Sequence, residues 1–298
     1  MKLVCVIVTK DRPEDLRRCL ASIVSADQII IVDGSITAKT VAKEFQCAYY
    51  QSKPGITRQR NLARQHIPSD TDIVVYCDDD TELSPNTLIK VREIFAAQPE
   101  VVGLTGNLDQ TVKHNFFKRL FGRLSLTYTK QPYGFTTGIF NIINSVTQPT
   151  KVDWLPGAFM CYRWSVVQDI IFDEWFTEYG LGEDFDFSYR VGTLGILLAD
   201  PSIVVAHHHS QVNRNWKKFG YMRLVNRNYL RVKLWPKQGL YWLGMWWSNM
   251  WLLAMPYRPE WIGEMQGLLT ILLKRAIFPR YENNLYRTKG YPSTGRRR

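Results

Sequence analysis

The chain of 298 residues carries 38 lysines and arginines against 27 aspartates and glutamates, which gives a formal net charge of +11. Its 45% content of hydrophobic residues suffices for one large packed domain or two ordinary ones, and excludes a disordered chain. The excess of positive charge indicates an anionic partner. That partner could be a nucleic acid, a phosphorylated small molecule or an anionic membrane, and charge alone does not choose among them.

The cysteines argue for a reducing compartment. They are odd in number, scattered and without any C-x-x-C spacing, so they suggest neither a disulfide framework nor a zinc site: Cys5, Cys19, Cys47, Cys77 and Cys161. The apolar run near the N-terminus extends only to Val8, which is short for a signal peptide. We therefore expect a cytoplasmic protein.

The first third of the chain alternates between strand and helix patterns. An apolar run over 3–8 predicts a buried strand, and Pro13 with apolar Leu16, Leu20 and Ile23 predicts a helix. The pattern continues with a strand over 28–32, a helix over 41–45, a strand over 48–50, a helix over 57–66 and a strand ending at Asp78. This alternation predicts an α/β fold with a mostly parallel sheet and helices on both faces, in which ligands bind at the carboxyl ends of the strands.

The last of these strands breaks abruptly into three carboxylates, Asp78, Asp79 and Asp80. Three adjacent negative charges repel one another unless solvent or a cation compensates them. Oxygen ligands at a strand end suit Mg²⁺ or Mn²⁺, which are often completed by the phosphate oxygens of a substrate. An acidic turn or a helix cap would give the same pattern, so that alternative stays open.

Four features occur in a fixed order along the chain: Asp33 at a strand end, the segment 55–61 with Arg60 and Asn61, the acidic triplet, and the segment 180–190 with Glu183, Asp184 and Asp186. The turn 154–160, Trp-Leu-Pro-Gly-Ala-Phe-Met, precedes the last of them. In these motifs residues 3–209 resemble a family 2 glycosyltransferase of the GT-A fold, which is Rossmann-like.

The resemblance implies a division of the chain. It places a GT-A catalytic domain over 1–213, with a nucleotide-binding half over 1–106 and an acceptor half over 107–213. The remaining residues, 214–298, are rich in Trp, Tyr, Arg and Lys and end in a basic tail. We expect them to form a helical, aromatic-rich extension.

The resemblance also implies roles for single residues. Asp33 would contact the nucleotide base, Asp80 would ligate the divalent cation, and Asp184 would be the general base, with Glu183 orienting it. The donor-binding residues would be Thr9, Asp33, Arg60, Asp78 and Asp79, and the acceptor-binding residues Trp154, Gly157 and Asp186. Carboxylates also favour the first turn of a helix, so Glu183, Asp184 and Asp186 could simply begin one.

Three consecutive histidines follow a predicted strand over 202–206. Strand alternation directs His207 and His209 to one side and His208 to the other. Some members of the family use a histidine downstream of the Glu-Asp motif as a metal ligand, and His207 and His208 stand at about that place. Of the two, we favour His208.

One departure from the family concerns the nucleotide. Many members have two acidic residues, or an acidic residue and Asn, before Gly-Ser, whereas this chain has the shorter Val32-Asp33-Gly34-Ser35. The choice among UDP, GDP and dTDP therefore stays open.

No charged residue occurs between Lys237 and Arg258, a length close to the minimum for crossing a bilayer. Tryptophans in the middle of this segment, together with Ser248 and Asn249, instead favour an interfacial helix, or a shallow hairpin with residues 261–278. The basic residues that would attract anionic lipid are Arg223, Arg227, Arg231 and Lys233. Packing of these aromatic residues onto the catalytic domain or a second subunit is the open alternative.

Together these features predict a metal-dependent inverting glycosyltransferase that uses Mn²⁺ or Mg²⁺; inversion is implied by the family. It would transfer a sugar from a nucleoside diphosphate sugar to a lipid-linked or polysaccharide acceptor at the inner face of the cell membrane, without a nucleic-acid partner. A sugar-phosphate nucleotidyltransferase normally has a glycine-rich phosphate loop near the first strand, and residues 8–13 are not such a loop. A non-enzymatic basic protein that binds membrane or RNA is the other alternative, against which the strand-end carboxylates argue.

Overall fold

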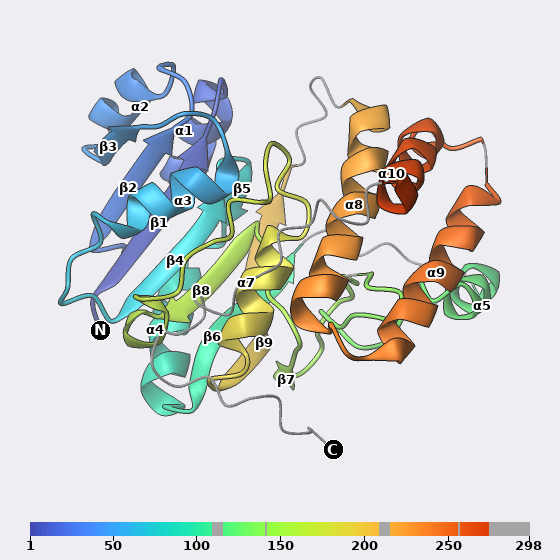
Figure 1. The fold of residues 1–298 in the computed structure, drawn as a ribbon. Helices are drawn as coiled ribbons and strands as arrows, with labels where there is room; N and C mark the ends of the chain where they lie inside the picture. The colour runs from blue at the N-terminus through green and yellow to red at the C-terminus, as the bar shows by residue number, and fades with distance from the viewer. Residues whose placement is uncertain (109–115, 141, 209–214, 256, 274–298) are drawn as a thin grey trace.

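A nine-stranded mixed sheet lies between two layers of helices, and a further group of helices stands beside it (Figure 1). The structure, a computed structural model, describes residues 1–108, 116–140, 142–208, 215–255 and 257–273. His209 and the basic tail over 287–298 lie outside the described residues. The observed architecture confirms the expected α/β fold with a helical C-terminal part.

The N-terminal half of the sheet is parallel, as the alternating pattern predicted. Its strands are β1 (Leu3–Thr9), β2 (Gln28–Asp33), β3 (Ala48–Gln51) and β4 (Ile73–Asp78), in the order β3-β2-β1-β4. The register pairs Thr9 with Asp33 and Val8 with Asp78. The carboxyl ends of β1, β2 and β4 therefore meet at one edge of the sheet.

The second half of the sheet is mixed. It contains β5 (Thr81–Leu83), β6 (Val101–Leu108), β7 (Thr150–Lys151), β8 (Phe159–Arg163) and β9 (Ile196–His207). Strand β8 runs antiparallel to both β4 and β6, while β9 is parallel to β6 and antiparallel to β5 and β7. The helix–strand alternation on which the parallel prediction rested covers only the strands β1 to β4.

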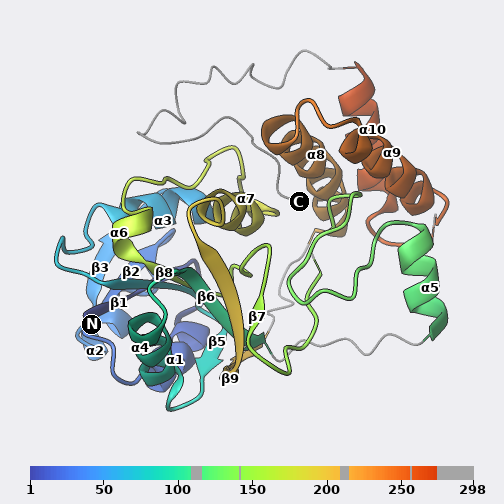
Figure 2. The same ribbon diagram turned by 90° about the horizontal axis from the view of Figure 1, so that it is seen from below.

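Helices cover both faces of the sheet (Figure 2). One layer consists of α1 (Pro13–Ser22), α2 (Lys39–Glu44) and α4 (Thr87–Ala97), and the other of α3 (Ile56–Arg64), α6 (Trp164–Val167) and α7 (Glu183–Val191). Leu16 of α1 and Phe95 of α4 pack on one face, and Phe185 of α7 on the other, each at most 1% exposed. Full burial of one such side chain stabilises the fold by about 1.5–3 kcal/mol.

Four helices stand beside this sandwich. They are α5 (Phe116–Leu124), α8 (Trp216–Leu234), α9 (Gly239–Leu253) and α10 (Trp261–Leu273). Helix α5 contains the basic residues Arg119 and Arg123 beside several apolar ones. Among the described residues, none of the helices combines the length and apolar character that crossing a bilayer requires.

A buried ion pair joins α8 to α7. Lys233 Nζ of α8 lies 2.6 Å from Asp186 Oδ1 of α7 and 2.6 Å from Asp173 Oδ2, and the Lys233 and Asp186 side chains are 2% and 0% exposed. Arg190 Nη2 lies 2.9 Å from the other oxygen of Asp186. The Asp186 carboxylate, which was predicted to contact the acceptor, thus faces α8 and lies between two cations.

We predict that Lys233→Met lowers the free energy of unfolding by about 3 kcal/mol, since Asp186 and Asp173 lose the buried cation that they share. Chemical denaturation measures the change. Lys237→Met removes the same charge from an exposed position near the end of the same helix and serves as the matched control. Equal stability of the two variants would contradict the structural role of the Lys233 ion pairs.

Candidate active site

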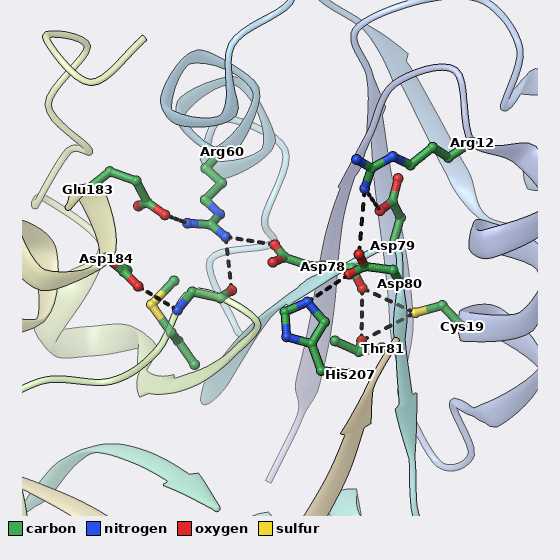
Figure 3. Close-up of polar contacts among 12 residues, drawn as sticks. Arg12, Cys19, Arg60, Asp78, Asp79, Asp80, Thr81, Glu183, Asp184 and His207 are labelled. Carbon is green, nitrogen blue, oxygen red and sulfur yellow. Dashed lines mark hydrogen bonds and ion pairs between the residues drawn. The ribbon is translucent and has the colours of Figure 1, made fainter. Parts of the chain in front are cut away.

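The acidic triplet stands at the carboxyl end of β4, in the turn that leads to β5 (Figure 3). Asp79 and Asp80 are 4% and 6% exposed. Thr9 Oγ1 donates a hydrogen bond of 2.7 Å to Asp79 Oδ2, and Arg12 Nη1 lies 3.3 Å from Asp79 Oδ1 and 3.6 Å from Asp80 Oδ2. Burial raises the pKa of Asp79 to about 7, although Thr9 and Arg12 act in the opposite direction. The loop after β1 thus compensates part of the triplet's charge.

Asp78, Asp80 and His207 form a group that fits a divalent cation. One ligand atom from each lies within 4.8 Å of the others, and His207 Nε2 is 3.0 Å from Asp80 Oδ1. Burial alone would lower the pKa of His207, but its hydrogen bond to Asp80 and the neighbouring carboxylates raise it. Two carboxylates and an imidazole are a donor set that suits Mn²⁺.

The structure places His207, and not the favoured His208, beside Asp80. In the antiparallel pairing of β5 with β9, Thr81 faces His207 and Glu82 faces Ala206. His208, two residues beyond Ala206, is therefore on the side of Glu82, and its Nε2 lies 3.0 Å from Glu82 Oε1. The histidine beside Asp80 is thus His207, whereas the sequence had favoured His208 as the metal ligand.

Arg60 lies between the triplet and α7 and contacts both (Figure 3). Its side chain is 1% exposed, with Nη1 2.5 Å from Glu183 Oε1 and Nη2 3.2 Å from Asp78 Oδ1. Nη2 also donates to the carbonyl of Gly157 at 3.0 Å. Burial opposes the charge on Arg60, but the Glu183 and Asp78 carboxylates prevail and raise its pKa. Arg60, which was predicted to bind the donor, contacts the carboxylates of Asp78 and Glu183.

Glu183 and Asp184 begin α7, directly after Gly182, whose φ of 93° favours glycine. Asp184 Oδ2 accepts a hydrogen bond of 2.9 Å from the Gly157 amide, and Oδ1 one of 2.8 Å from the Phe185 amide. Burial raises the pKa of Glu183 to about 8, against the effect of Arg60, and also raises the pKa of Asp184. Asp184 is thus an oriented carboxylate whose proton affinity exceeds that of an exposed aspartate.

The turn that was predicted to bind the acceptor borders the same space. A Cβ atom at Gly157 would stand 3.1 Å from Glu183 Oε1 and 3.4 Å from Asp184 Oδ2, so a larger residue would crowd these two carboxylates. The Trp154 ring is nearly buried, and its Nε1 donates to the Gly134 carbonyl at 3.2 Å. Both Trp154 and Gly157 line the cavity described next.

A cavity of about 1090 Å³ runs between the triplet and α7. It reaches the upper end of the range of ligand pockets and is large enough for a nucleotide with an attached sugar. Thr9, Lys10 and Arg12 line one part of the cavity. Tyr179, together with Phe219 of α8, lines another part. Lys10, Arg12 and Phe219 were not among the site residues predicted from the sequence. Lys10 and Arg12 follow β1, whose carboxyl end meets that of β4, and this topology could have identified them.

Asp33 does not line this cavity. Its side chain is fully buried, and Oδ1 accepts hydrogen bonds of 2.7 Å from both the amide and the hydroxyl of Ser35. Oδ2 accepts from the Ala38 amide at 2.9 Å and the Tyr49 hydroxyl at 3.2 Å. The carboxylate holds the loop after β2, and this arrangement does not support the predicted contact with a nucleotide base.

The comparisons with known proteins point to one enzyme class. Residues 4–170 match the family described as glycosyl transferase family 2. No protein of curated function has a matching sequence.

Solved structures share the fold at low sequence identity. GalNAc-T7, in a complex with UDP, GalNAc and Mn²⁺, is 16% identical with a TM-score of 0.62 over 92% of this chain and 56% of its own. The mannosyltransferase PcManGT from Pyrobaculum calidifontis, in a complex with GDP-Man and Mn²⁺, is 14% identical with a TM-score of 0.54 over 91% and 75%. TarS residues 1–349 from S. aureus are 14% identical with a TM-score of 0.55 over 92% and 82%. The chain thus spans only about half of GalNAc-T7.

The two histidines give a matched test of the metal site. We predict that His207→Ala weakens Mn²⁺ binding, measured calorimetrically in the presence of a nucleoside diphosphate, on the order of tenfold or more, because a neutral imidazole is a good ligand. His208→Ala should leave the affinity unchanged. The reverse result would return the ligand role to His208, and unchanged affinity in both variants would remove histidine from the site.

Proposed function

Since the chain belongs to glycosyl transferase family 2, we propose that it is a metal-dependent, inverting glycosyltransferase that uses a nucleoside diphosphate sugar. The observation that carries this proposal is the single cavity bordered by Asp78, Asp80 and His207 on one side and Asp184 on the other. Such an arrangement joins a candidate cation site to a candidate general base across a space that holds two substrates.

On the donor side, Asp78, Asp80 and His207 would hold the Mn²⁺ or Mg²⁺. A bound divalent cation supplies Lewis-acid stabilisation of the negative charge that develops on a leaving diphosphate. Lys10 and Arg12 border the same part of the cavity and would add positive charge beside the phosphates. The Thr9 hydroxyl and Arg12 keep Asp79 in place.

On the acceptor side, Asp184 would take the proton of the attacking hydroxyl. The hydroxyl oxygen forms a bond to the anomeric carbon while the bond from that carbon to the diphosphate oxygen breaks, which inverts the configuration. The Gly157 amide fixes one oxygen of Asp184. A raised pKa makes the carboxylate a stronger base at neutral pH than an exposed aspartate. Arg60 fixes Glu183 at its side.

Asp184→Asn tests the base, because the amide keeps the shape of the side chain but cannot accept the proton. Turnover should fall on the order of 10²-fold or more, while the affinity for the donor nucleotide stays nearly unchanged. Steady-state kinetics and calorimetric nucleotide binding separate the two effects. Near-normal turnover would transfer the role to Glu183.

The pH dependence of the wild-type enzyme gives a second test. The base must be deprotonated, and burial raises the pKa of Asp184. Activity should therefore decline, as pH falls, at a value above about 3.9, which is usual for an exposed aspartate. A profile of kcat/KM against pH measures this acidic limb. A flat profile down to pH about 3.9 in a stably folded enzyme would contradict the role of Asp184.

The proposal extends to the acceptor and the place of action. We infer a lipid-linked or polysaccharide acceptor and attachment to the inner face of the cell membrane without crossing it. The support is the segment between Lys237 and Arg258, which lacks charge but carries four tryptophans, beside the basic residues of α8. The sugar and the nucleotide of the donor are left open, since the similar structures contain different nucleotides.

A further inference from the structure

Helix α9 buries polar residues and exposes apolar ones, which is the reverse of an ordinary surface helix. Its polar residues Ser248 and Asn249 are at most 1% exposed and accept hydrogen bonds of 2.7 and 2.8 Å from Arg227. Its apolar residues Leu243, Trp247 and Met250 are 51–62% exposed. These three recur at intervals of three and four residues and so share one side of the helix. A helix beside water normally has the opposite arrangement.

Helix α5 lies beside α9 (Figures 1 and 2) and also exposes apolar side chains. The Phe121 and Trp251 ring centroids are 4.9 Å apart, and Trp247 Nε1 donates to the Leu124 carbonyl at 2.7 Å. We define the α5–α9 face as six of the exposed apolar residues of the two helices, which are 45–77% exposed: Phe117, Leu120, Leu124, Leu243, Trp247 and Met250. Such a gathering on one side of a protein indicates an interaction surface.

The surroundings of this face select its partner. Arg119 and Arg123 of α5 are exposed. The sequence contains no aspartate or glutamate over 110–152 or over 201–259, the two stretches that supply α5, α8 and α9. A second copy of the chain would bring two basic surfaces together, and their charges would repel. An anionic lipid bilayer offers both complementary charge and an apolar layer.

We propose that the α5–α9 face docks on an anionic bilayer, with its apolar side chains at the boundary between headgroups and acyl chains. This inference rests on the proposed peripheral attachment and deepens it, because it adds α5 to the contact surface. The loop after α5 includes Gly134, whose carbonyl accepts from the Trp154 indole beside the cavity. This loop thus connects α5 to the residues beside the cavity.

The experiment measures co-sedimentation of the full chain with phosphatidylcholine vesicles that contain or lack phosphatidylglycerol. Arg119→Gln with Arg123→Gln should weaken binding to anionic vesicles about 25-fold, at about fivefold for each arginine near the surface. Phe117→Ser with Leu120→Ser should weaken it on the order of tenfold or more through loss of apolar burial. Ile89→Ser on α4, which is 42% exposed, is the matched control and should bind as the wild type does.

Three results would overturn the docking. They are binding by the α5 variants equal to that of Ile89→Ser, equal binding of the wild type to vesicles with and without phosphatidylglycerol, and a dimer in sedimentation velocity that Phe117→Ser with Leu120→Ser dissociates. The last would assign the face to a second copy. Mn²⁺-dependent binding of a nucleoside diphosphate without vesicles should be normal in every variant. Its absence from the wild type would refute the proposed function and leave the vesicle result to stand alone.

Discussion

The structure depends on keeping three adjacent carboxylates close together at the end of a buried strand. Asp79 and Asp80 are nearly removed from solvent, where isolated negative charge is strongly disfavoured. Cationic groups from separate elements therefore contact the three carboxylates of the triplet. Arg12 comes from the loop after β1, Arg60 from α3 and His207 from the end of β9. The topology that brings these ends to one edge of the sheet is what makes the site possible.

Arg60 connects this constraint to catalysis. Its guanidinium contacts Asp78 of β4, Glu183 of α7 and the Gly157 carbonyl. Buried ion pairs contribute little net stability, because loss of hydration offsets their attraction, so their value lies in position. Here one planar group sets the distance between the proposed metal site and the proposed base. The Lys233–Asp186 pair fixes the other side of α7 to α8, so the C-terminal helices help to place Asp184.

The features that sequence could predict are those decided by neighbouring residues. Alternating apolar runs predicted β1 to β4, and the carboxylates of the triplet and of the Glu183-Asp184 pair were recognised where they stand. The differences between the expected and the observed arrangement concern tertiary partners. His207 and His208 differ only by the register of β9 against β5, which the sequence does not display. Asp33 and Asp186 have the right chemistry, but Ser35 and Lys233 occupy their oxygens. Ser248 and Asn249, which favoured an interfacial helix in the sequence, face Arg227 in the structure.

The central claim is that the triplet and His207 hold a cation at the donor's diphosphate. The most direct measurement is anomalous diffraction at the manganese edge from crystals that contain Mn²⁺ and a nucleoside diphosphate. We expect one anomalous manganese peak, in contact with Asp80, with His207 and with the phosphate oxygens of the nucleotide. A peak held by His208 and Glu82, or a nucleotide bound in the cavity with no manganese at the triplet, would contradict it.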